Sequence, residues 1–180
     1  MPKKPYSKRT DLEKVESNWT KTLGLFSRKE YSLSIVRAAV TAELAINYAI
    51  RYELHDNHGV PSTFIDKQLM DANGIANKLD RLYIPILIGT EHEKQTKEIA
   101  KSIKTLNKQR NDIAHRGEFR KKETAQQFVE LAEKEINVLL KRYNSEVTLT
   151  TFIPSKTHSI TIPSMNGFIT IPMHPEEDEK

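Results

Sequence analysis

Arg110 and His115 are residues whose types and spacing suit chemistry on an anion. Arginine keeps its charge at any physiological pH, and its planar guanidinium binds phosphate or carboxylate through parallel hydrogen bonds. Histidine has a reference pKa of about 6.5, so it can give or take a proton near neutral pH. Together the two side chains could hold an anion and move a proton beside it.

Arg110 interrupts an apolar stripe on a predicted helix. The stripe contains Ile99, Ile103, Leu106, Arg110 and Ile113, which recur at steps of four, three, four and three residues. A charged side chain at a core-facing position needs an anionic partner, a bound anion or a path to solvent. We expect Glu43 to be the internal partner, because it interrupts an apolar stripe of an earlier helix in the same way.

His115 follows Arg110 by five residues, and Gly117 is placed to end the same helix. Five residues at about 100° each set the two side chains roughly 140° apart around a regular helix. We therefore expect them to meet only if the last turn is distorted, or if a second copy of the chain faces them across a two-fold axis. Asn111 lies four residues before His115, where its amide can orient the imidazole.

The elements that must position these residues are helices, because apolar residues recur at spacings of three and four from residue 11 to about 143. We expect helices over 11–27, 29–54, 63–88, 91–116 and 123–143, with the third broken near Gly74 and Pro85. The second has a face of small residues and isoleucine, which lets another helix approach closely and predicts the centre of a bundle. This face contains Ile35, Ala38, Ala39, Ala42, Ala45, Ile46 and Ala49.

The ends of the chain differ from its helical part. We expect a basic flexible arm over residues 1–10, a helical domain over 11–145 and an acidic tail over 176–180. Residues 146–175 are rich in threonine and isoleucine, and Asn166-Gly167 separates two alternating runs, which predicts a β-hairpin with a type I′ turn. The fold class is therefore all-α, a bundle of four to five helices with a C-terminal β-hairpin extension.

The composition narrows the classes of function. The chain has no cysteine, which excludes disulfides, iron–sulfur clusters, thiolate zinc sites and a cysteine nucleophile. The stretch HDNHG at 55–59 lacks a further ligand set, so we expect no metal and no other cofactor. No apolar run approaches the roughly 20 residues of a membrane span, so we expect a soluble, cytoplasmic protein without a membrane partner.

The net charge suits a partner rich in phosphate, although a merely soluble basic surface would look the same. The formal charge of the chain is +4 and its sequence pI is about 9.1. The acidic tail over 176–180 carries a charge of −3, so the remaining 175 residues carry +7.

The hexapeptide RNDIAH at 110–115 resembles the Arg-x4-His motif of the HEPN-domain family. It ends a helix, a glycine and another amphipathic helix follow, and Asn111 matches the commonest residue after the arginine. Glu43 resembles the acidic or polar residue often found on the second helix. The resemblance implies a HEPN-like bundle over 11–143 and a homodimer. Many members are metal-independent RNases that act as prokaryotic toxins or antiviral effectors, with an antitoxin or defence-system partner.

The resemblance implies RNA as the substrate, and RNA brings its own nucleophile, the 2′-OH. His115 would then act as acid or base, Arg110 would hold the phosphate, and Asn111 would orient His115 or bind the phosphate. The implied products are a 2′,3′-cyclic phosphate and a 5′-OH.

Basic residues follow the motif and could track an RNA backbone, or could simply form a solvated helix start. They are Arg116, Arg120, Lys121 and Lys122. We also expect Arg116 to pair with Asp112, four residues before it.

Other interpretations stay open at this point. The chain could be a non-catalytic HEPN-type module that binds RNA or a partner, or a dimerisation subunit whose hairpin adds to a partner's sheet. Arg110 could be a buried arginine that organises the bundle beside a capping histidine. Arg51 and His58, with six residues between them, also fit a looser pattern of an arginine followed by a histidine after four to six residues, so spacing alone is weak support.

Overall fold

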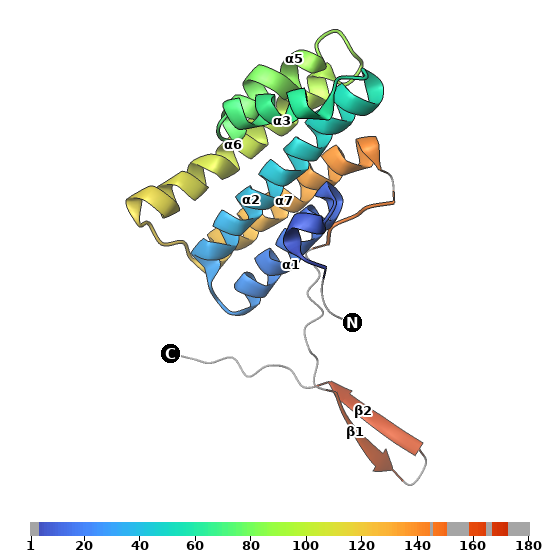
Figure 1. Ribbon diagram of the computed structural model, residues 1–180. Coiled ribbons are helices and arrows are strands. Elements are labelled where there is room, and N and C mark those ends of the chain that lie inside the picture. Colours follow the sequence, from blue (N-terminus) through green and yellow to red (C-terminus); the bar gives the residue numbers. More distant parts are fainter. Residues whose placement is uncertain (1–3, 145, 151–158, 165–166, 173–180) are drawn as a thin grey trace.

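The computed structural model describes residues 4–144, 146–150, 159–164 and 167–172, and its helical part is all-α. The four long helices shown in Figure 1 are α1 (Asp11–Ser27), α2 (Tyr31–Arg51), α6 (Glu93–Arg116) and α7 (Lys122–Tyr143). Their bounds lie within two residues of the predicted ones, except at the end of α2, which is shorter than expected.

Short helical segments connect α2 to α6. They are η2 (Tyr52–Asn57) and η3 (Leu79–Tyr83), both π-helices, together with α3 (Ser62–Asp71), α4 (Ile75–Lys78) and α5 (Ile84–Ile86). The predicted breaks are confirmed, because Gly74 adopts a φ of 82° before α4 and the helix that contains Pro85 ends at Ile86. The continuation of α2 as η2 explains why α2 itself ends early.

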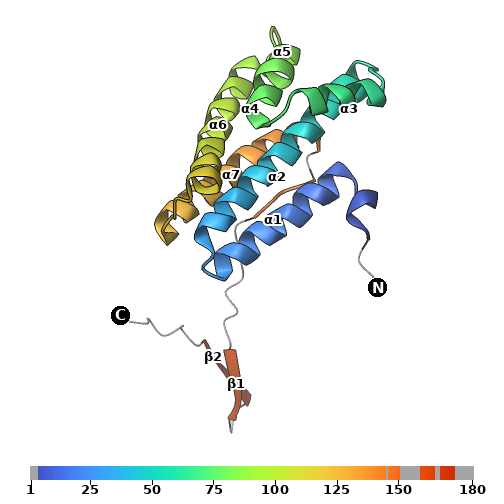
Figure 2. The same cartoon turned by 60° about the vertical axis from the view of Figure 1, so that its left-hand side comes forward.

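The central helix is α2, and α1, α6 and α7 all pack against it (Figures 1 and 2). The predicted face of alanine and isoleucine on α2 is confirmed, because all seven of its side chains are at most 5% exposed. Small side chains allow neighbouring helices to approach closely. The buried side chains that complete the core include Ile99, Ile103 and Leu106 of α6 and Ile136, Leu139 and Leu140 of α7.

The continuous helix Tyr31–Asn57 is long and apolar enough to cross a membrane by length and composition, which the expectation from apolar runs did not anticipate. More than half of its apolar window is buried inside the molecule. Packing against three other helices accounts for that composition. The cytoplasmic location of the protein stays a prediction.

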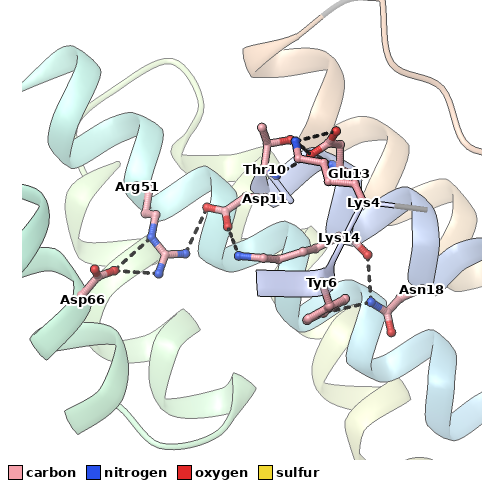
Figure 3. A network of polar contacts seen from close by, with 9 residues as sticks. All are labelled: Lys4, Tyr6, Thr10, Asp11, Glu13, Lys14, Asn18, Arg51 and Asp66. Atoms are coloured by element: carbon pink, nitrogen blue, oxygen red, sulfur yellow. Dashed lines mark hydrogen bonds and ion pairs between the residues drawn. The ribbon is translucent and has the colours of Figure 1, made fainter. Parts of the chain in front are cut away.

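Residues 4–10 lie against α1 (Figure 3), and the flexibility expected of the arm over 1–10 stays a prediction. The Thr10 side chain accepts a hydrogen bond from the Glu13 backbone N–H at 3.2 Å, and the Glu13 carboxylate accepts one from the Thr10 N–H at 2.6 Å. Lys4 pairs with Glu13 at 2.7 Å, and this hydrogen bond lowers the pKa of Glu13. The 3₁₀ turn η1 (Tyr6–Lys8) joins the two ends of the arm. The capping box of α1 thus also holds the arm.

The helical domain extends to Thr150, which corrects its predicted boundary at residue 145. The Asn137 amide donates to the Leu149 carbonyl at 2.8 Å and accepts from the Leu149 N–H at 2.7 Å. Trp19 Nε1 donates to the Thr150 carbonyl at 2.9 Å, and the Leu149 side chain is buried. The segment after α7 therefore completes the core instead of opening the extension.

Farther along, β1 (Ser159–Ser164) pairs antiparallel with β2 (Gly167–Pro172), and Ile162 lies opposite Ile169. Asn166 of the predicted turn and the acidic tail over 176–180 lie outside the described residues.

Asn137→Ala is expected to lower the free energy of unfolding by roughly 1–3 kcal/mol, because a backbone N–H and a carbonyl both lose their partner. Amide hydrogen exchange at Leu149 should rise in the same variant. Gln126→Ala, which removes only a bond between exposed side chains of α7, is the matched control. Equal thermal stability of the two variants would contradict the role given to Asn137.

Candidate functional site

The end of α6 carries Arg110 out of the core. Ile99, Ile103 and Leu106 of its apolar stripe are at most 1% exposed, whereas Arg110 and Ile113 are only half-buried. Arg110 therefore has the path to solvent that a permanently charged side chain requires.

Arg110 and His115 meet within one regular helix. Nη1 of Arg110 lies 3.4 Å from Nε2 of His115, and α6 is α-helical through Arg116. The expectation that they would need a distorted turn or a second subunit is therefore wrong. The reason is the length of the arginine side chain. It reaches around the helix toward the direction of His115 and also covers the rise of about 7.5 Å along the helix axis over five residues.

The remaining edge of the Arg110 guanidinium is open. Both of its hydrogen-bond contacts, to Asn111 Oδ1 at 2.9 Å and to His115, use Nη1. Within the part of the chain that the structure describes, Nε and Nη2 of Arg110 have no partner. These two nitrogens form the side of the fork that binds two oxygens of a phosphate or carboxylate.

Asn111 positions the arginine instead of the histidine. Its Oδ1 accepts from Arg110, whereas the sequence predicted that its amide would orient His115. The neighbouring guanidinium, a charged donor, offers the amide oxygen a stronger hydrogen bond than a neutral ring does. The imidazole of His115 is exposed and keeps its contact with Arg110.

Glu43 is not the partner of Arg110, which corrects the sequence prediction. Its carboxylate pairs with Lys78 of α4 at 2.6 Å. The Lys78 side chain is 9% exposed, so this ammonium group needs a counter-ion far more than the half-buried Arg110 does.

Gly117 ends α6 in the left-handed conformation, with φ 67° and ψ 23°, as predicted. Its N–H donates to the carbonyl of Asp112. The Asp112 carboxylate lies 3.3 Å from Arg116, so the predicted pair of these two residues is also confirmed.

The four basic residues after the motif fall into two groups. The Arg116 side chain is 70% exposed even in its ion pair, and Lys121 and Lys122 are exposed at the start of α7. Arg120 is different, because its guanidinium donates to Gln109 at 2.8 Å and to Glu118 at 2.6 Å. Arg120 therefore braces the loop, and its role as a residue that tracks RNA stays a prediction.

The other arginine–histidine match has a structural role. Arg51 donates to Asp11 of α1 at 3.1 Å and to Asp66 of α3 at 2.7 Å, and so links three helices (Figure 3). Its Nε also donates to Asp66, so every nitrogen of this guanidinium has a partner. This engagement distinguishes Arg51 from Arg110.

A buried polar cluster inside the bundle has a structural role as well. Arg142 donates to the Tyr83 hydroxyl at 2.8 Å and to Thr96 Oγ1 at 2.9 Å, and the hydroxyls of Tyr83 and Tyr143 lie 2.9 Å apart. Burial raises the pKa of both tyrosines, so both stay neutral and serve as hydrogen-bonding groups. The cluster ties η3, α6 and α7 together.

Sequence reasoning missed Phe119, whose side chain is 91% exposed in the loop between α6 and α7. Its signal in the sequence is a lone aromatic residue among the charged residues Glu118, Arg120, Lys121 and Lys122, with no apolar neighbour to suggest a core position.

No family model, curated protein or solved structure matches the chain. Among the described residues, no group of three or more His, Cys, Asp and Glu side chains could hold a metal ion.

The proton of the neutral His115 ring is expected on Nδ1, because Nε2 faces a guanidinium that can only donate. Arg110→Met should remove this constraint and change the tautomer ratio. Nitrogen-15 chemical shifts of the ring at about pH 9, where a reference histidine is neutral, measure the ratio. The exposed His58 is the internal reference, and unchanged His115 shifts in the variant would contradict the contact.

Proposed function

We propose that this chain is a metal-independent endoribonuclease of HEPN type, with its active site at the end of α6. The observation that carries the proposal is the 3.4 Å contact between Arg110 and His115 at an accessible helix end. The two side chains bring together an open guanidinium edge and an exposed imidazole, which phosphoryl transfer from a 2′-OH can use.

The reaction needs no nucleophile from the protein. The 2′-oxygen of RNA attacks the adjacent phosphorus, and His115 Nε2 exchanges its contact with Arg110 for the 2′-OH and takes the 2′ proton. Nε and Nη2 of Arg110 hold two phosphate oxygens and stabilise the charge of the phosphorane. The bond from phosphorus to the 5′-oxygen then breaks, that oxygen takes a proton from solvent, and the products are a 2′,3′-cyclic phosphate and a 5′-OH.

Each neighbouring residue has a place in this proposal. Asn111 holds the guanidinium through its Oδ1, so it acts as a positioning residue for Arg110. Arg116, Lys121 and Lys122 are exposed and supply positive charge for the RNA backbone. We place the protein in the cytoplasm as a homodimer, acting as a toxin or antiviral effector with an antitoxin or defence-system partner.

A second candidate function is a non-catalytic module that binds RNA or a partner protein. It is favoured by the contact of Asn111 with Arg110, because that contact leaves the imidazole without the orienting amide expected for it. A general base works best when a further group fixes its orientation.

Cleavage of a mixture of tRNA and mRNA in EDTA tests the proposal. Wild type should leave fragments with 2′,3′-cyclic phosphate and 5′-OH ends, and His115→Ala should lower the rate by about 10²- to 10⁴-fold. His58→Ala is the matched control, since His58 is also exposed and follows Arg51, whose guanidinium is occupied by Asp11 and Asp66.

Equal cleavage by wild type and His115→Ala, or activity that EDTA abolishes, would contradict the metal-independent mechanism. Binding of RNA without cleavage, unchanged in His115→Ala, would instead favour the binding module.

A further inference from the structure

Phe119 lies next to the proposed active site in a loop that the bundle holds firmly. The backbone N–H of Arg120 donates to Ser32 of α2 at 2.8 Å, and its side chain donates to Gln109 of α6. The same guanidinium donates to the Phe119 carbonyl at 3.3 Å and to the Glu118 carboxylate. The ring is therefore presented by a braced backbone, which reduces the entropy lost when a ligand binds.

The residues on either side of Phe119 are both anchored to the turn of α6 that carries Arg110. Gln109, which accepts from Arg120, immediately precedes Arg110. Asp112, whose carbonyl accepts from the Glu118 N–H at 3.4 Å, lies between Arg110 and His115. A ligand held at Arg110 is therefore close to the loop that carries the exposed ring.

The surroundings of Phe119 fit a nucleic acid better than a protein. Exposed Arg116, Lys121 and Lys122 flank the ring in the chain, and an aromatic ring among cations is typical of surfaces that bind single strands. Leu33, beside Ser32, adds one half-exposed apolar side chain. Two side chains fall well short of the roughly 800 Å² that a stable protein interface buries on each partner.

We propose that Phe119 stacks on an unpaired base of the RNA whose phosphate Arg110 holds. This inference rests on the proposed ribonuclease function and defines its substrate class as single-stranded RNA. Every base has a π face, so stacking of this kind is tolerant of sequence, whereas the bases of a duplex are already stacked on one another.

The test measures the affinity of the full chain for a fluorescent single-stranded RNA, in a His115→Ala background that prevents cleavage. Adding Phe119→Leu should weaken binding about 5- to 150-fold, because leucine keeps apolar surface but loses the π face. Phe119→Tyr should retain the affinity. Phe64→Leu, on an exposed phenylalanine of α3 at the other end of α2, is the control and should bind like the parent.

The outcomes separate the two proposals. Equal affinity of the parent and Phe119→Leu for the RNA overturns stacking. Stacking is also overturned if light scattering shows a dimer that Phe119→Leu dissociates, because the ring then packs against a second copy. Failure of the parent to bind RNA overturns both proposals. Binding that depends on Phe119, together with intact RNA after incubation with wild type, supports stacking and overturns the nuclease. Cleavage by Phe119→Leu with unchanged KM keeps the nuclease and overturns stacking.

Discussion

The close packing of α2 against three helices is the constraint on which the rest of the structure depends. Ala38, Ala42, Ala45 and Ala49 are fully buried, so the distance of each neighbouring helix from α2 is set by methyl groups. Larger side chains on this face would overpack the core, which typically costs about 1–3 kcal/mol. The loop that follows α6 is held at the start of α2. Its anchor is the hydrogen bond from the Arg120 backbone N–H to Ser32 Oγ.

Arginines in this bundle are distinguished by what their guanidinium groups already bind. Arg51 and Arg120 use each of their nitrogens to join helices or to brace a loop. Arg142 donates to Tyr83 of η3 and to Gln95 and Thr96 of α6. Arg110 uses Nη1 alone and keeps one edge of its fork accessible. This difference separates Arg110 from Arg51 and Arg120, whereas Arg37 also donates through Nη1 alone.

Periodicity in the sequence predicted the long helices and the central face of α2, because those features depend on local propensity and on burial along a single helix. The partners of charged residues could not be predicted in the same way. Glu43 stands on an apolar stripe, but its ion pair depends on where α4 brings Lys78, and that position follows from the whole path between α2 and α6. The roles of Arg120 and Phe119 likewise depend on how the loop folds back on α6.

For the candidate site, the sequence predicted the residues but not their geometry. An angle of roughly 140° around a helix describes Cβ directions, and the long side chain of Arg110 reaches His115 in spite of it. The predicted domain boundary at 145 failed for a related reason, since the buried Leu149 follows α7 without any helical pattern to mark it.

The central claim is that Arg110 and His115 act on RNA as one unit. A double-mutant cycle of single-turnover cleavage rates in EDTA, with Arg110→Ala, His115→Ala and the double variant, tests it most directly. The account predicts that each single variant is severely slowed and that the double variant is hardly slower than the worse single one. A wild-type rate in either single variant, or effects that add fully in the double variant, would contradict it.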